Sequence, residues 1–241
     1  MRRFLTTPFT DALFGLDRCM ARGLTSLAWV TAGLLGGWWL YVPVHELLHA
    51  AGCLIGGGTV TRLEISPIYL GGVLARVIPW VEAGGEYAGR LSGFDVGGND
   101  GVYLLTDFAP FLLTLFPGVW LLRRTARRRQ PFLFGLTLPL ALAPFTSITG
   151  DAYEIGSILT TRLGPWGSEG AKEILRGDDL FYKFSDVASA STAGLWAGLA
   201  VAAGIGLLWA LSTYAAGAWI ARGLGQKALE DPKSTPQPPG P

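Results

Sequence analysis

The distribution of apolar and charged positions along the chain predicts a membrane protein. A helix needs about 20 mainly apolar residues to cross the hydrocarbon layer of a bilayer. Stretches of that kind span residues 24–58, 102–122, 131–149 and 187–221. Glu46 and Asp107 are the only Asp, Glu, Lys or Arg residues in them. Four such stretches are difficult to house in one soluble core, and they indicate several transmembrane helices.

The number of spans depends on how the two longest stretches are divided. Residues 24–58 and 187–221 are each longer than one span requires. Each could form one long helix or two spans, and residues 24–58, which Pro43 interrupts, could also form a span followed by a re-entrant segment. We therefore expect an all-α polytopic membrane protein with four to six transmembrane helices.

The segment after the first apolar stretch has a different pattern. Residues 60–65 and 73–78 alternate between apolar and polar side chains and contain β-branched residues, with two glycines between them. This pattern predicts a small β-hairpin or sheet. The expected organisation is a lead-in at 1–23, a membrane-embedded core at 24–163 with a β-rich insertion at 59–101, a polar loop at 164–186 with a short helix at 168–176, a C-terminal transmembrane segment at 187–221 and a disordered tail at 222–241.

Composition and charge narrow the possibilities further. Half of the residues are hydrophobic and 15% are charged, against about a quarter in soluble domains. With 19 basic and 18 acidic residues, a nucleic-acid partner is not expected. Two cysteines exclude a disulfide framework. Five arginines in the loop 123–129 predict that this loop, which could touch anionic lipid, faces the cytoplasm. Arg222 and Lys227 predict the same side for the C-terminus, and the protein is expected to be integral to the cell membrane.

His45 and His49 are the only histidines, and they form the pattern His-Glu-x-x-His with Glu46. Residues four apart on a helix share one face, so the two imidazoles can bind one zinc ion. Glu46 is rotated off that face, which suits a base that takes a proton from the water attacking a carbonyl group. Ionisable groups at membrane depth are costly and are usually functional.

A catalytic zinc site needs a third protein ligand. Cys53 continues the helical stripe, but it lies about 12 Å along the axis from His45 and is expected to be a buried apolar residue. The remaining candidates are carboxylates. Asp151 follows the stretch 131–149 and is the first choice, with Glu154 second and Asp107 third.

These features resemble the site-2 protease family of intramembrane zinc metalloproteases. His-Glu-Leu-Leu-His-Ala lies in an apolar helix, a glycine-rich β-like segment follows, and a later span ends in an Asp-bearing turn. The resemblance covers about residues 40–160. It implies a three-span core in which His45, His49 and Asp151 bind zinc and Glu46 is the general base.

Two other segments bear on this resemblance. Phe108-Ala109-Pro110 loosely resembles the Gly-Pro turn of the family's middle core span. The family's Asn-Pro and Asp-Gly signature is absent, since only Pro144 precedes Asp151, and Ala152 stands where glycine is usual. The chain would therefore be a divergent member.

The main hypothesis is a zinc metalloendopeptidase that hydrolyses a peptide bond in or near a transmembrane segment of a membrane-protein substrate. A sheet edge within 60–78 would take the substrate as an added strand, and Thr106, Asp107 and Thr149 would line a path for water. The alternative is a zinc-binding membrane adaptor that holds a partner without cleaving it. A transporter would predict inverted repeats, and none is found.

Overall fold

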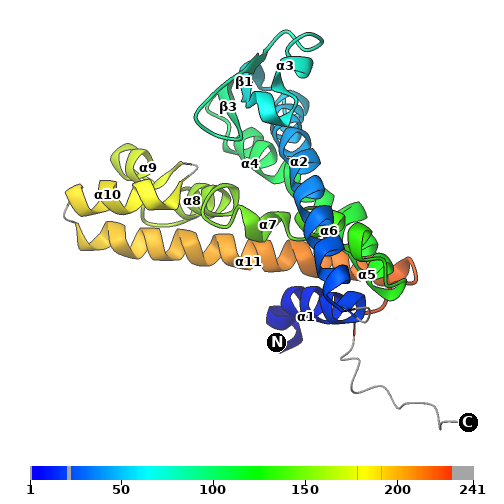
Figure 1. The fold of residues 1–241 in the computed structure, drawn as a ribbon. Coiled ribbons are helices and arrows are strands. Elements are labelled where there is room, and N and C mark those ends of the chain that lie inside the picture. The colour runs from blue at the N-terminus through cyan, green and yellow to red at the C-terminus, as the bar shows by residue number, and fades with distance from the viewer. Residues whose placement is uncertain (1, 21–22, 178, 191, 230–241) are drawn as a thin grey trace, which may run out of the picture. The chain divides into compact units, whose positions relative to one another are not determined.

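The computed structural model describes residues 2–20, 23–177, 179–190 and 192–229 (Figure 1). The chain divides into two compact units. The first comprises Met1–Tyr41, Leu113–Ala143 and Leu211–Pro241, and the second comprises Val42–Leu112 and Pro144–Ala210. Two long helices, α2 (Leu24–Ile55) and α11 (Ala193–Gly223), each have one part in the first unit and the other part in the second.

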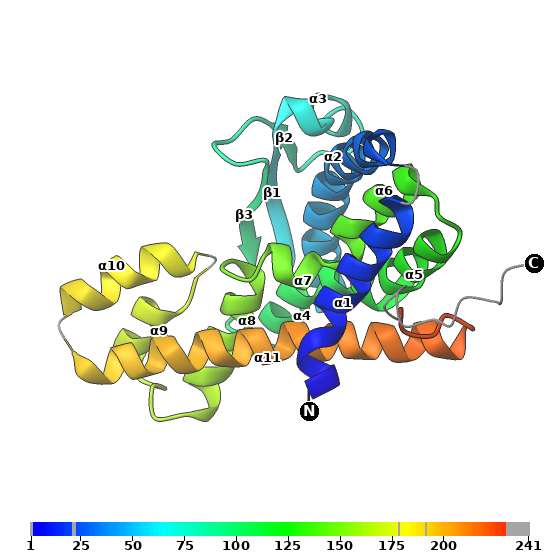
Figure 2. The same cartoon turned by 60° about the horizontal axis from the view of Figure 1, so that its bottom comes forward.

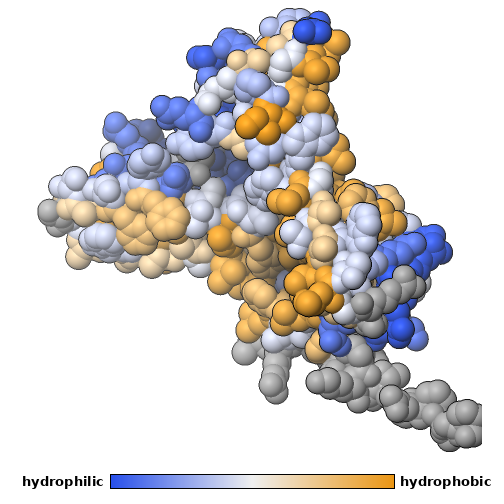
Figure 3. Space-filling model, viewed as in Figure 1, coloured by the Kyte–Doolittle hydropathy of each residue, from blue (hydrophilic) through white to orange (hydrophobic). Residues whose placement is uncertain are grey.

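Three stretches of the described chain are long and apolar enough to cross a membrane. They are α2 (Leu24–Ile55), the helical stretch Asp100–Arg127 and α11 (Ala193–Gly223), and α6 (Pro131–Ala141) is a shorter apolar helix. The predicted stretch 24–58 therefore contains one long helix, and most of the stretch 187–221 lies in another. Figure 3 shows apolar residues among more polar ones over α2, and several large apolar side chains of this helix, such as Trp29 and Leu35, are exposed. The expected total of four to six spans stays a prediction.

The first unit is built from helices that approach each other closely. It contains α1 (Arg2–Cys19), the N-terminal part of α2, a π-helical turn η4 (Thr114–Gly118), α5 (Val119–Arg127), α6 and the C-terminal part of α11. A Cβ atom on Gly33 of α2 would overlap the carbonyl oxygen of Phe132, and one on Gly135 of α6 would overlap that of Val30. Glycine is required at these positions because the two backbones are in contact.

The predicted span 102–122 is not one regular helix. Helix α4 (Asp100–Phe108) continues into a 3-10 turn η3 (Ala109–Phe111), and η4 precedes α5. Pro110 and Pro117 lie in these irregular turns, and proline lacks the N–H group that a regular helix requires. The predicted basic loop 123–129 is also wrong in part, because its first five residues belong to α5.

The second unit contains a three-stranded sheet with the order β2-β1-β3. Strand β1 (Thr59–Ile65) pairs in parallel with β2 (Val81–Ala83) and antiparallel with β3 (Gly89–Asp95). Figures 1 and 2 show the sheet beside the C-terminal part of α2. The small sheet after the motif helix is thus present, within the predicted insertion 59–101.

One of the two predicted strands is wrong. Residues 60–65 lie in β1, but residues 73–78 form no strand, and a 3-10 turn η2 (Pro67–Tyr69) leads into the short helix α3 (Gly71–Leu74). Leu70 has a positive φ of 68°, and a Cβ atom on Gly71 would overlap the carbonyl oxygen of Ile65. The chain therefore turns back on itself here, where the alternating pattern alone predicted an extended segment.

Helices complete the second unit. They are α8 (Asp151–Leu163), α9 (Glu169–Leu175), α10 (Leu180–Ala190) and the N-terminal part of α11, with α7 (Ala143–Thr146) preceding them. Tyr153, Leu175, Val187 and Leu199 form the centre of a buried cluster among these helices. The short helix predicted at 168–176 matches α9, whereas the predicted segment 187–221 starts inside α10 and is divided before Ala193.

The termini differ from a simple lead-in and tail. The lead-in forms α1, and α11 extends to Gly223. Beyond it, the carbonyl of Gln226 accepts a hydrogen bond from Arg123 and the amide of Leu229 donates one to Asp11. Residues 224–229 are therefore held against the first unit, although they lie in the segment expected to be disordered. Residues 230–241 lie outside the described part of the chain.

Candidate metal centre

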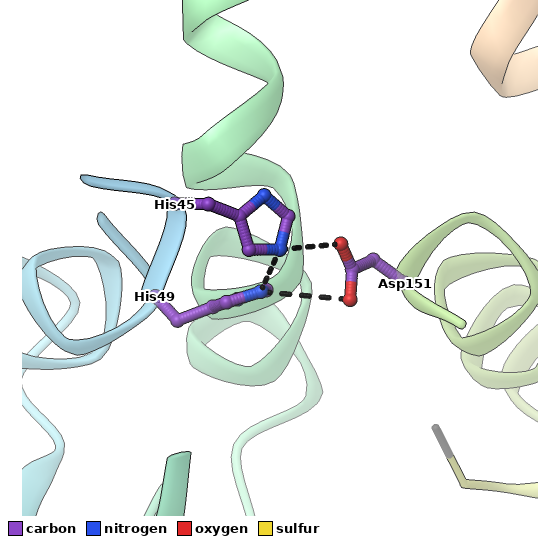
Figure 4. Close-up of side chains that lie close together, drawn as sticks. All are labelled: His45, His49 and Asp151. Atoms are coloured by element: carbon purple, nitrogen blue, oxygen red, sulfur yellow. Dashed lines mark hydrogen bonds and ion pairs between the residues drawn. The ribbon is translucent and has the colours of Figure 1, made fainter. Parts of the chain in front are cut away.

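His45 and His49 face each other from consecutive turns of α2, within the second unit. Their Nε2 atoms lie 3.0 Å apart, and the two rings are inclined by 82° (Figure 4). Both residues are 8% exposed. The helical spacing of four residues brings the rings to one face, as the sequence predicted.

Asp151 reaches the same point from a different helix (Figure 4). Its Oδ2 atom lies 3.2 Å from Nε2 of His45, and its Oδ1 atom lies 3.5 Å from Nε2 of His49. Asp151 is the first residue of α8, and Gly150, which precedes the helix, makes no side-chain cap. The carboxylate of Asp151 is thus directed to the imidazoles, and one ligand atom from each residue lies within 4.8 Å of the others.

The hydrogen bonds of His49 favour a cation at this point. Nδ1 of His49 lies 2.9 Å from the carbonyl oxygen of Thr106, which can only accept, so Nδ1 carries the proton. In the neutral ring Nε2 then presents a lone pair toward the carboxylate of Asp151. Two acceptors this close repel each other unless a proton or a metal ion lies between them.

The three residues fit a metal ion in number, type and spacing. Ligand atoms bound tetrahedrally to zinc at 2.0–2.1 Å lie about 3.3 Å from one another. The two Nε2 atoms lie 3.0 Å apart, Oδ2 of Asp151 lies 3.2 Å from His45 and Oδ1 lies 3.5 Å from His49, so each imidazole has a carboxylate oxygen near that distance. Two imidazoles and one carboxylate leave a fourth position for water or substrate. The group of His45, His49 and Asp151 could therefore hold a metal ion.

The group of His45, His49 and Asp151 opens into a cavity of about 640 Å³. Glu46, His49 and Asp151 line it together with residues of β3, including Gly89. A Cβ atom on Gly89 would overlap Cγ of Glu46 and lie 2.9 Å from its Cδ. The first residue of β3 therefore has to be small for the Glu46 side chain to occupy its place in the cavity.

The other candidate ligands lie apart from the cluster. Among the described residues, the potential metal-binding group comprises the two histidines and Asp151. Asp107 is buried on α4 and lines the cavity, and Glu154 lines it while accepting a hydrogen bond from Tyr103. Cys53 is fully buried, and its thiol donates to the carbonyl of Thr59 over 3.6 Å. It is thus the buried apolar residue that was expected.

Two of the three residues expected along a water path lie at the cavity. Thr106 and Asp107 line the cavity. Thr149 is not among the described residues that line it, and its carbonyl accepts a hydrogen bond from the amide of Leu180. The strand beside the cavity is β3, outside the range 60–78 in which the sequence placed a substrate-binding edge.

Two contributors to the site, Gly89 and Tyr103, were not found from the sequence. Thr106 was expected only as a polar lining residue, and the contact of its backbone carbonyl with His49 is one that no residue pattern reveals. Gly89 is one of 34 glycines, and its requirement becomes visible only when Glu46 is seen beside it. A signal for Tyr103 was present in the sequence, because its position three residues before Thr106 places both residues on one helical face.

Comparisons of the chain with protein-family models, with curated proteins and with solved structures found no match. The function is therefore inferred from the geometry of the site.

Proposed function

We propose that this protein is an intramembrane zinc metalloendopeptidase that resembles the site-2 protease family and cleaves a membrane-protein substrate. The observation that carries the proposal is the convergence of His45, His49 and Asp151, whose ligand atoms lie within 4.8 Å of one another. Glu46 lines the cavity into which this cluster opens. Three ligands with an adjacent carboxylate form the arrangement that metal-assisted peptide hydrolysis requires.

Each residue would have a distinct task in the reaction. His45, His49 and Asp151 would hold zinc, which when bound lowers the pKa of water toward neutrality and polarises a carbonyl group. The carboxylate of Glu46 would accept a proton from the attacking water and return it to the amide nitrogen as the peptide bond breaks. The Thr106 carbonyl would hold the His49 ring in the orientation and tautomer needed for binding.

Strand β3 supports the choice of an extended polypeptide as the substrate. It is an edge strand of the sheet, and five of its residues line the cavity with Glu46: Gly89, Arg90, Leu91, Ser92 and Phe94. A substrate segment that unwinds from its helix could pair with the free edge of β3, which would satisfy its exposed backbone groups. Its peptide bonds would then pass next to the metal cluster.

The membrane setting completes the proposal. Three stretches long and apolar enough to cross a bilayer support a site that acts within the cell membrane. Arg127, Arg128 and Arg129 are exposed at the end of α5, and we place this end and the C-terminus in the cytoplasm, since arginine is enriched on that side.

The test separates metal binding from peptide hydrolysis. Cells would express the wild-type chain or the Glu46→Gln variant, and new fragments of single-span membrane proteins would be measured by mass spectrometry. Loss of a general base lowers a rate by about 10²–10⁴-fold, so fragments present with wild type should fall at least about 100-fold. Zinc measured in the purified proteins should remain at one ion per chain in both.

A matched control tests whether any loss of charge has the same effect. Glu169 lies on α9, is 89% exposed and pairs with Lys172, so Glu169→Gln should leave the fragments unchanged. Equal fragments from wild type and Glu46→Gln would reject the protease. If zinc were still bound in that case, the non-proteolytic adaptor would be the better description.

A further inference from the structure

The candidate metal ligands come from two helices that depend on a third for their alignment. His45 and His49 lie on α2, and Asp151 lies on α8. Helix α4 contacts both ligand-bearing helices, because the carbonyl of Thr106 accepts from His49 on α2 and the hydroxyl of Tyr103 donates to Oε1 of Glu154 on α8. All of these residues belong to the second unit.

The spacing on each helix connects these contacts directly to the ligands. Tyr103 and Thr106 are three residues apart on α4, and Asp151 and Glu154 are three residues apart on α8, so each pair shares one helical face. The bond between Tyr103 and Glu154 therefore joins α4 to α8 within one turn of Asp151. Glu154 is 7% exposed, so water competes little for this bond.

We propose that Tyr103 and Glu154 are positioning residues that set the distance between the carboxylate of Asp151 and the two imidazoles, and thereby the affinity of the site for its metal. The inference rests on the proposed metal site and assigns Glu154 a support role in place of a ligand role. Metal bonds tolerate departures of about 0.2 Å, so a small shift of α8 relative to α4 is enough to weaken binding. Partners that orient ligands typically contribute 10–100-fold to affinity.

A second connection between α4 and α8 provides a matched control. Arg176 donates to both carboxylate oxygens of Asp100 on α4, at 2.7 and 3.1 Å, and to the hydroxyl of Thr161 on α8 at 2.7 Å. Thr161 lies ten residues after Asp151, about 15 Å along the helix. Loss of this connection loosens the same two helices at a distance from the ligands.

The experiment measures zinc affinity of the purified full chain by competition with a chromogenic chelator, together with the visible spectrum after cobalt substitution. Tyr103→Phe and Glu154→Leu should each lower the affinity about 10–100-fold and change the cobalt spectrum. The double variant should lose little more than either single one, because both remove the same bond. Glu154→Gln, which keeps an acceptor oxygen for the tyrosine, should retain affinity within about threefold.

Arg176→Gln should lower thermal stability while leaving zinc affinity and the cobalt spectrum unchanged. The proposal is overturned if Tyr103→Phe binds zinc as tightly as wild type, or if Arg176→Gln weakens binding to the same extent. It is also overturned if the effects of Tyr103→Phe and Glu154→Leu add in full. A wild-type chain that binds no zinc would reject the metal site itself, which distinguishes that failure from a failure of the positioning pair.

Discussion

Arg123 on α5 and Asp11 on α1 form an ion pair in which both side chains are completely buried. Nε and Nη2 of Arg123 lie 2.8 and 2.7 Å from Oδ2 of Asp11. The hydroxyl of Tyr214 and the amide of Leu229 also donate to this carboxylate, and the carbonyls of Ala218 and Gln226 accept from the guanidinium. The pair thus joins α1, α5, α11 and the segment after α11 within the first unit.

The ion pair predicts a large and asymmetric effect of substitution. Arg123→Met would leave the carboxylate of Asp11 buried without its partner, so the free energy of unfolding should fall by about 3–5 kcal/mol. Replacing both residues, as in Asp11→Leu with Arg123→Met, should restore much of the loss. Thermal unfolding in detergent measures both changes. Arg128→Met, at an exposed position, should change stability by less than about 0.5 kcal/mol.

Asp151 should be required for metal binding. Asp151→Asn replaces a charged ligand by a neutral amide, so zinc affinity should fall by at least about 100-fold. Loss of a residue that only supports a ligand typically costs about 10–100-fold. Elemental analysis after dialysis against a chelator measures the change. Asp107→Asn, a buried carboxylate in the same cavity but outside the cluster, should retain zinc. Retention in Asp151→Asn with loss in Asp107→Asn would reverse the ligand assignment.

Gly89 should affect hydrolysis without affecting the metal. A methyl group at this position would displace the side chain of Glu46. A displacement of about 1 Å can cost about 100-fold in rate, so Gly89→Ala should lower fragment production by about 10–100-fold while zinc stays bound. Gly72→Ala is the control, since a Cβ atom there meets open space. Full activity of Gly89→Ala would contradict the placement of the base.

Gly206 and Gly204 on α11 should respond in opposite ways to the same substitution. A Cβ atom on Gly206 would overlap the carbonyl oxygen of Ala152 on α8, whereas one on Gly204 meets open space. Gly204→Ala should be neutral or stabilising by up to about 1 kcal/mol, because alanine favours the helix. Gly206→Ala should destabilise by about 1–3 kcal/mol and weaken zinc binding, because α8 carries Asp151. Thermal unfolding and zinc titration test both expectations.

Cys19 on α1 should react slowly with alkylating reagents. Burial raises the pKa of its thiol to about 11, since the charged thiolate loses solvation. Only the thiolate reacts, so the rate of carbamidomethylation should rise about tenfold per pH unit up to about pH 11. Peptide mapping by mass spectrometry measures the rate at this residue. In detergent-unfolded chain the rate should level off near pH 9, and the same plateau in the folded protein would contradict the shift.

Part of this fold follows from local patterns. The apolar stretches around α2 and α11 predict long membrane helices because their length and lack of charge allow few other structures. The pattern also predicted β1 and α9. It failed at residues 73–78, where alternation suggested a strand, because a left-handed residue at Leu70 and the contact of Gly71 with the backbone of Ile65 reverse the chain.

The sequence alone determined how His45, Glu46 and His49 are placed relative to one another. His45, Glu46 and His49 lie on two consecutive turns of one helix, so their geometry is fixed by local backbone structure. Only the tertiary structure decided that Asp151, and neither Glu154 nor Asp107, approaches the two imidazoles. The three carboxylates have the same chemistry, and each lies in or just after a predicted apolar stretch. Their separation depends on how α8 packs against α4 and α11, through contacts between residues far apart in the chain.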